Sequence, residues 1–274
     1  MGVSQLPDLP PVLADIQQMQ ALCRNRGPTA AFSPAEETRL LNTLYRAEMD
    51  IQGLMPWSSN YTFLAVLSGP DADSLMAVYK PCAGERPLWD FPGGNLCRRE
   101  FASYLLSRVL GWPNIPPTVL RDGPHGEGAV QLFIEADFEA HYFTLREDRR
   151  FLSQFRQIAL FDYIANNADR KGGHCLKDRH DRLWAIDHGL TFHAHFKLRT
   201  VIWDFCLEPI PPDLLEDLHH LHRLVESSGV FGEVMGRYIS PREMEAMKER
   251  LTALLETRQF PDVHPGRSVP FPPV

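Results

Sequence analysis

The sequence lacks long apolar runs, a surplus of basic residues and any C-x-x-C motif. No segment approaches the ~20 apolar residues that a membrane-spanning helix requires, and the N-terminus has no basic stretch followed by an apolar one. The formal net charge of −7 argues against nucleic acid or an anionic membrane as the main partner, because both attract basic surfaces. These absences predict a cytoplasmic protein with no nucleic-acid partner and no stable membrane association.

Cysteines are few, odd in number and widely spaced along the chain. This pattern is typical of reduced thiols, and it argues against a structural zinc site built on cysteine. The five positions are Cys23, Cys82, Cys97, Cys175 and Cys206. With 44% hydrophobic and 23% charged residues, the 274-residue chain has the balance of a folded protein with one large core or two packed lobes.

The first half of the chain combines predicted strands with two predicted helices. The segment 33–36 (Ser-Pro-Ala-Glu) is a capping box with proline in the first turn, which predicts a helix from there to about Asp50. Apolar residues from Leu96 to Val109 recur at helical spacing, and Gly111 supplies a stop. Strands are expected at 61–67, 75–80, 116–120 and 129–134.

From about residue 145 the pattern changes to longer helices. Helices are expected at 145–166, 213–227 and 241–256, a short strand pair at 175–176 and 183–186, and an extended proline-rich tail at 261–274. An antiparallel sheet with one key helix, followed by a mostly helical half, predicts an α+β protein of two lobes. The N-terminal lobe is expected at 1–136 and the C-terminal lobe at 137–274.

Two neighbouring loops each carry an acid. Asp169 follows the end of a predicted helix, and Asp187 follows a short apolar strand and precedes His188 and Gly189. Phosphoryl transfer requires one carboxylate that orients the attacking group and accepts its proton, and another that holds Mg²⁺ against the phosphates. Upstream, Lys80 on a strand and Glu100 on a helix follow the order of the lysine–glutamate pair that positions ATP in kinases.

Six residues around the two acids can be compared with the active-site motifs of a known family: Asp162, Tyr163, Asn167, Asp169, Arg170 and Asp187. They resemble the D-Y-x-x-x-N-x-D-R catalytic loop and the downstream metal-binding aspartate of phosphatidylinositol 3- and 4-kinase-like proteins. The segments 79–81 and 84–87 resemble the lysine strand of a bacterial branch of that superfamily. The resemblance spans residues 58–192. It implies a two-lobed protein-kinase-like fold that binds ATP, with Lys80, Asp169 and Asp187 at matched positions.

Other members of the expected site follow from the kinase order of elements. Lys171, two residues after the catalytic acid, is expected to neutralise the γ-phosphate. The connector at 131–136 is expected to supply backbone hydrogen bonds to adenine, with Phe133 and Glu135 as the candidate positions. Arg170 is expected to steady the loop rather than to contact substrate.

Two departures from the family pattern bear on activity. His174 stands five residues after Asp169, where these families place an asparagine metal ligand, and its nitrogen suits Mn²⁺ better than Mg²⁺. No glycine-rich loop is present. In its place stand Ser58, Ser59 and Asn60, whose backbone amides and polar side chains are able to grip phosphate.

The leading hypothesis is an ATP-dependent phosphotransferase with ATP and Mg²⁺ or Mn²⁺ as cofactors. Its acceptor is unidentified, and a protein or small molecule fits the acidic charge better than a lipid does. Nucleotidyl transfer would use the same groups with ATP reversed. Two alternatives are a nucleotide-binding pseudokinase with a regulatory role, which His174 and the glycine-poor loop favour, and a metallohydrolase centred on His188, His193 and His195.

Overall fold

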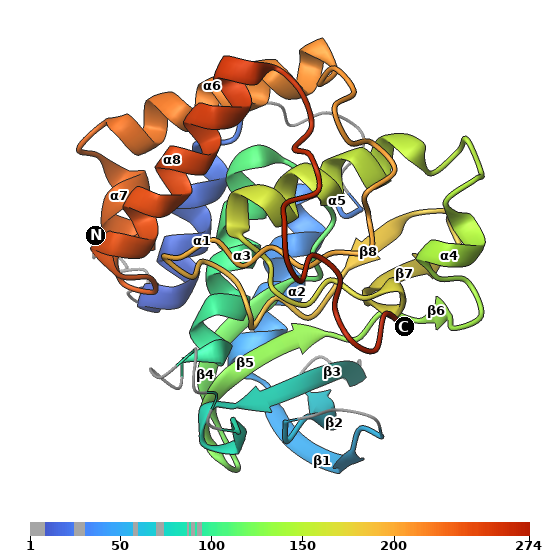
Figure 1. Ribbon diagram of the computed structural model, residues 1–274. Coiled ribbons are helices and arrows are strands. Elements are labelled where there is room, and N and C mark those ends of the chain that lie inside the picture. The colour runs from blue at the N-terminus through green and yellow to red at the C-terminus, as the bar shows by residue number, and fades with distance from the viewer. Residues whose placement is uncertain are drawn as a thin grey trace.

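The computed structural model describes residues 9–24, 31–56, 60–69, 74–86, 88, 91 and 95–274. Figure 1 shows an antiparallel sheet in one lobe and a group of helices in the other, with long connecting segments where the two meet. The predicted α+β class is therefore confirmed. The division of the lobes at residues 136 and 137 stays a prediction.

Five antiparallel strands form the sheet, in the order β1-β2-β3-β5-β4. They are β1 (Glu48–Leu54), β2 (Phe63–Ser68), β3 (Ser74–Pro81), β4 (Thr118–Gly123) and β5 (Gly126–Leu132). The four predicted strands correspond to β2, β3, β4 and β5. The first strand was missed, because the helix expected to reach Asp50 ends at Arg46 and the chain then pairs with the edge of β2. Contacts distant in sequence decide that outcome rather than local propensity.

Strand β3 orients the lysine through simple alternation of its side chains. Ala77 and Tyr79 are completely buried in the core, whereas Lys80 lies on the opposite face of the strand and is partly exposed. The backbone of Lys80 is held opposite Ala129 of β5, near the middle of the sheet. The ammonium group therefore extends from a rigid element rather than from a loop.

Three helices accompany the sheet: α1 (Pro11–Ala21), α2 (Pro34–Arg46) and α3 (Leu96–Leu110). The predicted capping box of α2 is present, with Ser33 and Glu36 bonded reciprocally. Helix α3 is buried along nearly its whole length and ends at Gly111 in the left-handed conformation, with φ of 77°. That helix carries Glu100, which is only 1% exposed.

The second lobe contains five helices and a small sheet within the described ranges. The helices are α4 (Tyr142–Leu145), α5 (Leu152–Ala165), α6 (Pro212–Glu226), α7 (Val230–Met235) and α8 (Pro241–Thr257). The strands β6 (Ala136–Asp137), β7 (Cys175–Asp178) and β8 (Leu183–Ala185) pair antiparallel in that order. The β7–β8 pair and the helices predicted at 213–227 and 241–256 are confirmed, whereas the helix predicted at 145–166 begins only at Leu152. Helix α5 ends at Asn166, whose left-handed conformation directs the chain into the loop of Asp169.

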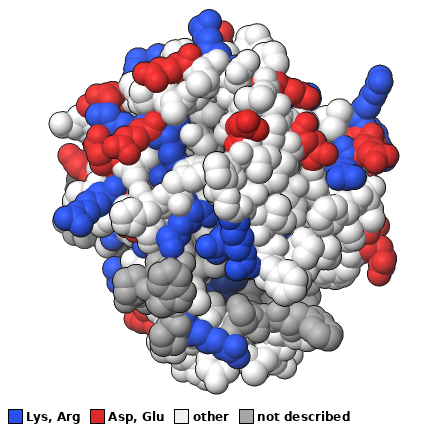
Figure 2. Space-filling view, viewed as in Figure 1, with Lys and Arg blue, Asp and Glu red and all other residues white. Residues whose placement is uncertain are grey.

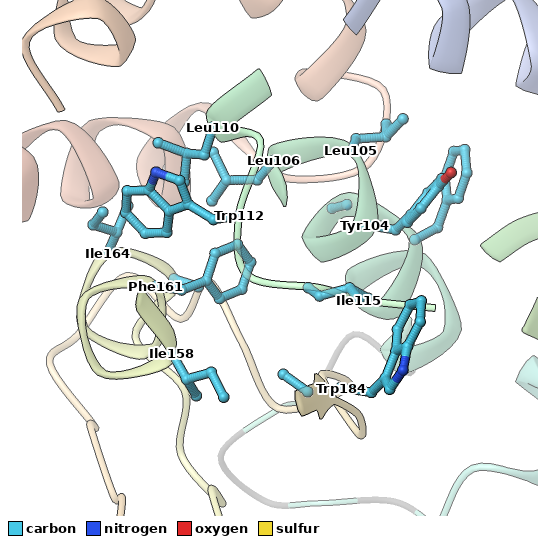
Figure 3. Packing of buried hydrophobic residues seen from close by; sticks show 14 of the residues in the cluster. Tyr104, Leu105, Leu106, Leu110, Trp112, Ile115, Ile158, Phe161, Ile164 and Trp184 are labelled. Carbon is cyan, nitrogen blue, oxygen red and sulfur yellow. The ribbon is translucent and has the colours of Figure 1, made fainter. Parts of the chain in front are cut away.

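One hydrophobic core runs from the sheet side of α3 into the helical lobe. Figure 3 shows Trp112, just after α3, packed beside Phe161 and Ile164 of α5. The Trp112 indole also donates a hydrogen bond of 2.9 Å to Asp217 of α6, so its polar edge is satisfied. Burial of each large side chain contributes roughly 1.5–3 kcal/mol, and this packing fixes α3 relative to α5. Glu100 is thereby fixed relative to the loop that follows α5.

The expectation that all five cysteines are reduced is wrong for two of them. Cys82 and Cys97 form a disulfide, with their Cα atoms 5.6 Å apart and a separation of 15 positions in sequence. Spacing alone did not indicate this pair, because the turn between β3 and α3 brings the two together. The cytoplasmic location stays a prediction. No helix in the described ranges is long and apolar enough to cross a bilayer.

Candidate active site

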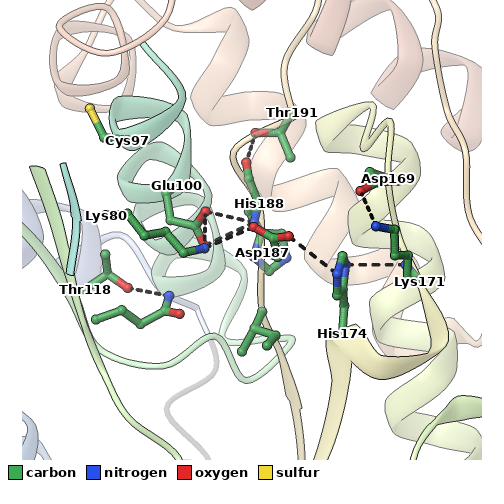
Figure 4. A network of polar contacts seen from close by, with 12 residues as sticks. Lys80, Cys97, Glu100, Thr118, Asp169, Lys171, His174, Asp187, His188 and Thr191 are labelled. Atoms are coloured by element: carbon green, nitrogen blue, oxygen red, sulfur yellow. Dashed lines mark hydrogen bonds and ion pairs between the residues drawn. The ribbon is translucent and has the colours of Figure 1, made fainter. Parts of the chain in front are cut away.

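Lys80 makes two ionic contacts, one within the sheet lobe and one with the helical lobe. Its Nζ lies 3.1 Å from Oε2 of Glu100 on α3 and 3.0 Å from Oδ1 of Asp187, just after β8. Figure 4 shows the three side chains pointing toward one another from three different elements. A cation of the sheet and an anion of the helical lobe are therefore in direct contact, and their role in a nucleotide site stays a prediction.

The charges of this cluster stabilise one another. Burial opposes the ammonium charge of Lys80, but attraction to Asp187 and Glu100 outweighs it and raises the pKa of Lys80. Lys80 in turn holds the pKa of Asp187 well below its usual range. Both groups are therefore ionised at neutral pH. If a metal ion paired with Asp187, the ammonium group of Lys80 could bind phosphate oxygens instead.

Asp187 sits in the left-handed region of backbone space, with φ of 61°. Aspartate tolerates this conformation better than most residues, and such backbone is concentrated at functional sites. Its side chain remains 49% exposed, so the carboxylate faces the crevice rather than the core. The backbone N–H of the next residue, His188, donates to both oxygens of Glu100 at 3.1 and 3.0 Å. Glu100 therefore holds both Lys80 and the loop of Asp187.

Asp169 lies at the other end of the same polar network, beside Lys171. The Nζ of Lys171 is 3.3 Å from Oδ2 of Asp169, and the dashed contacts in Figure 4 run from Lys80 through Asp187, His174 and Lys171 to Asp169. Burial raises the pKa of Asp169 to about 6, and repulsion from Asp187 adds to the shift. A carboxyl with this pKa is suited to accept a proton near neutral pH.

His174 lies on the side of Asp187 opposite Lys80. Its Nε2 is 3.4 Å from Oδ2 of Asp187, and its ring is only 15% exposed. Burial lowers the pKa of His174 to about 4, so the imidazole is neutral at physiological pH and keeps a lone pair for a cation. One nitrogen and one carboxylate oxygen therefore converge, the donor set that suits Mn²⁺ better than Mg²⁺.

A buried network beneath these side chains fixes the loops. Arg170 is completely buried and forms a bidentate ion pair with Asp162 of α5, at 2.8 and 2.9 Å. The same guanidinium donates to the backbone oxygens of His174 and Ile186, at 3.2 and 2.8 Å. Asn167 donates 2.9 Å to Asp162. Arg170 therefore ties the end of α5 to both loops, which supports its expected steadying role.

Replacing Asp162 with Asn should strongly destabilise the protein. The change leaves the buried charge of Arg170 without its anion, and breaking such a pair costs about 3–5 kcal/mol. Urea unfolding measures the free energy of unfolding directly. Asp148→Asn, which breaks an exposed ion pair with Arg150, is the matched control and should leave that free energy almost unchanged. Equal effects of the two changes would contradict this role of the buried pair.

The three histidines of the metallohydrolase hypothesis do not gather around one point. His188 is completely buried, with Nε2 2.7 Å from Arg170, whereas the His193 and His195 rings lie 5.6 Å apart near the surface. Among the residues that the structure describes, the three potential ligands within 4.8 Å of one another are Cys82, Glu85 and Cys97. The histidine-centred hypothesis therefore has no support in this geometry.

Five further residues were expected to contact the nucleotide, and the structure describes three of them. Ser58 and Ser59 lie outside the described residues. Asn60 accepts a hydrogen bond of 2.9 Å from the Arg86 backbone through its side chain, which braces the turn after β3. The Phe133 N–H donates a hydrogen bond of 3.0 Å to the backbone oxygen of Met76 of β3. Glu135 is exposed. The roles of all five in nucleotide binding stay predictions.

Basic side chains mark the junction of the lobes. On the face shown in Figure 2, Lys and Arg gather near the middle of the molecule, while Asp and Glu are seen mainly over the helical lobe. Lys80 and Lys171 contribute cations to the crevice and are 21% and 24% exposed. Both lysines are paired with carboxylates, Lys80 with Glu100 and Asp187 and Lys171 with Asp169, so charges of both signs meet between the lobes.

Comparison with known proteins identifies one close relative in sequence. The chain is 34% identical over 258 residues to Protein Rv2133c of Mycobacterium tuberculosis, an alignment that covers 82% of this chain and 92% of the relative. It belongs to the Rv2133c family. No protein-family profile matches the sequence.

Solved structures establish the fold class of this Rv2133c-family protein. A Golgi casein kinase superposes with a TM-score of 0.56 at 17% identity, covering 93% of this chain and 81% of that one. Fam20 from hydra, solved with a sugar, superposes with a TM-score of 0.54 at 12% identity, covering 89% of this chain and 94% of that one. The protein-kinase-like fold is thereby confirmed. The finer resemblance to phosphatidylinositol 3- and 4-kinases stays a prediction.

Proposed function

We propose that the protein is an ATP-dependent phosphotransferase. The observation that carries the proposal is the convergence of Lys80, Glu100 and Asp187 within 3.1 Å contacts across the two lobes. Kinases require such a lysine–glutamate pair, together with a metal-binding aspartate. The Golgi casein kinase of similar fold is named for phosphoryl transfer, which agrees with this assignment.

In the proposed reaction, the oxygen of an acceptor hydroxyl forms a bond to the γ-phosphorus of ATP and gives its proton to Asp169. The bond between that phosphorus and the β–γ bridging oxygen breaks, and ADP leaves. Lys171, whose ammonium lies 3.3 Å from that carboxylate, is close enough to neutralise the γ-phosphate oxygens as charge redistributes. Lys80 binds the α- and β-phosphates and is held in place by Glu100. The acceptor is a hydroxyl of a protein or small molecule.

The residues present fit a divalent metal ion. Asp187 and His174 would hold it, and the phosphates and water would supply the remaining ligands, as is usual when two protein groups bind such an ion. A bound metal neutralises phosphate charge and orients the transferring group. Attraction of Asp187 to that metal would also free Lys80 for the phosphates, because the two are paired at 3.0 Å in this structure.

Transfer from γ-labelled ATP tests the proposal. Purified protein incubated with label and Mn²⁺ or Mg²⁺ should transfer phosphate to itself or to a component of a lysate, and Asp169→Asn should abolish the transfer. ATP binding without any transfer or hydrolysis would favour the pseudokinase alternative. Absence of ATP binding would exclude both.

Activity should depend on pH through Asp169. Because burial raises the pKa of this carboxyl to about 6, the ionised base becomes scarce below that pH. We expect kcat to fall about tenfold per pH unit below pH 6 and to level off above pH 7. Lys171 lowers the pKa of Asp169. Lys171→Met should therefore move the midpoint of the kcat–pH profile to higher pH. An unchanged midpoint would contradict the assignment of Asp169 as the base.

Metal preference should depend on His174. Changing it to Asn replaces the nitrogen ligand with an amide oxygen, so the ratio of Mn²⁺- to Mg²⁺-supported activity should fall roughly tenfold. Initial rates in each metal measure the ratio. His180→Asn removes an exposed histidine elsewhere in this lobe and is the matched control. The same ratio in both variants would show that His174 does not ligate the metal.

A further inference from the structure

The Cys82–Cys97 disulfide joins the same two elements as the Lys80–Glu100 ion pair. Cys82 begins the short turn Cys82–Gly84 directly after β3, two residues beyond Lys80. Cys97 lies in the first turn of α3, three residues before Glu100 and therefore one turn away on a neighbouring part of the helix surface. A covalent and an ionic link thus run in parallel between β3 and α3.

Glu85 provides a third link at the same place. One oxygen of its carboxylate accepts a hydrogen bond of 2.8 Å from the backbone N–H of Cys97. The other oxygen is buried and has no hydrogen-bond partner among the described residues. The first turn of α3 is therefore anchored to the turn after β3 by a covalent bond and one charge-assisted hydrogen bond. Loss of the covalent bond would leave the hydrogen bond and the ion pair to hold the helix.

The disulfide is open to a reductant at one sulfur. Cys97 is 3% exposed, whereas Cys82 is partly exposed and lines a cavity of about 460 Å³. The remaining residues of that cavity are Asn95, Arg98, Glu127, Arg237, Tyr238 and Ile239. Because Cys97 does not line this cavity and Cys82 does, a small dithiol is expected to reach the disulfide from the side of Cys82.

The positions of the two sulfurs favour exchange in one direction. A thiolate of the reductant attacks Cys82, forms a mixed disulfide with it and displaces Cys97 as a thiolate. Cys97 lies in the first turn of a 15-residue helix, where the positive end of the helix dipole stabilises a thiolate. The second thiol of the reductant then releases Cys82. Two electrons pass to the protein, the reductant becomes a disulfide, and both cysteines end as thiols.

We propose that Cys82–Cys97 is a redox-modification site that controls how firmly Glu100 is held against Lys80. In the oxidised protein the disulfide keeps Glu100 in contact with Lys80, and ATP binds tightly. Dithiol reduction loosens the first turns of α3 and weakens ATP binding. The effect on ATP rests on the proposed function, whereas the movement of α3 does not.

Two measurements on the full-length protein test the inference. Amide hydrogen exchange without nucleotide compares the oxidised protein with protein reduced by dithiothreitol, and titration with a fluorescent ATP analogue gives the affinity of each form. A zinc-selective chelator is included, because the reduced thiols and Glu85 would offer three ligands to a soft cation. On reduction we expect faster exchange in α3, unchanged exchange in α6 and α8, and an affinity lower by about fivefold or more.

Matched variants distinguish an effect of the Cys82–Cys97 disulfide from an effect of dithiothreitol on other cysteines. The double variant Cys82→Ser, Cys97→Ser should resemble the reduced wild type and ignore dithiothreitol. Cys206→Ser, which removes a partly exposed cysteine of the helical lobe, should respond as the wild type does. In Glu100→Gln the ATP affinity should no longer depend on redox state, because the ionic link is already lost.

Three outcomes decide the inference. Equal exchange in α3 and equal ATP affinity in both redox states would overturn it. Faster amide exchange throughout the protein would show that the disulfide stabilises the whole fold rather than α3 alone. That result would also overturn the inference. If α3 alone loosens on reduction while neither form binds ATP, the link between strand and helix is supported and the proposed function fails.

Discussion

Replacing Asp169 with Asn is expected to reduce turnover by about 10²–10⁴-fold while ATP still binds. The amide keeps the size of the side chain and an oxygen toward Lys171 at the 3.3 Å contact, but it does not accept the proton of the acceptor. The loss should appear in kcat, because Asp169 acts on the reacting hydroxyl rather than on bound nucleotide. Steady-state kinetics and an ATP titration measure the two effects separately.

The control for Asp169 is a carboxylate on the same lobe that is remote from the crevice. Asp181 pairs with Arg150 and Lys177 at the surface, and Asp181→Asn should leave kcat unchanged. Turnover that survives in Asp169→Asn within a factor of about two would contradict the base assignment. The phosphates would then have to be attacked without help from this carboxylate.

Replacing Lys80 with Met is expected to weaken the use of ATP by about 10- to 100-fold in kcat/KM. A charge-assisted hydrogen bond contributes about 1.5–3 kcal/mol, and each 1.4 kcal/mol is about tenfold. Methionine keeps the apolar stem that packs along β3 but removes the ammonium that meets Glu100 and Asp187. Kinetics at varied ATP concentration and direct titration measure the loss.

Lys177→Met is the matched control for Lys80. Lys177 is a strand lysine of β7 with similar exposure of its side chain, 20% against 21%, and it pairs with Asp181 on the surface. Its replacement should leave ATP binding unchanged. If both variants bind ATP as the wild type does, the ionic cluster around Lys80 is structural and does not bind nucleotide.

The sequence predicted elements best where local signals agree with the fold. Capping boxes at Ser33 and Ser240 mark the starts of α2 and α8, and Gly111 marks the end of α3. The order of Lys80 and Glu100 was readable because strand alternation and helical spacing are local patterns. Their convergence with Asp187 was expected from the kinase order of elements and from the family resemblance, because no local pattern indicates it.

Other features depend on contacts that no local pattern encodes. Strand β1 exists because β2 offers an unpaired edge, and residues 48–54 have no strong preference of their own. The disulfide arises because one turn places Cys82 beside the start of α3. The sequence likewise did not indicate the hydrogen bonds from the Arg170 guanidinium to the backbone oxygens of the two loops. The residues around Arg170 resemble a kinase catalytic loop, but that resemblance does not specify these bonds.

We propose that Lys80, Asp169 and Asp187 line one nucleotide site. A crystal structure with a non-hydrolysable ATP analogue and Mn²⁺ would locate the nucleotide relative to these three residues. We expect phosphate oxygens on Nζ of Lys80, the metal on Asp187 and His174, and the γ-phosphate beside Asp169. A nucleotide bound elsewhere, or a Lys80 that stays paired with Asp187 while the analogue is bound, would contradict it.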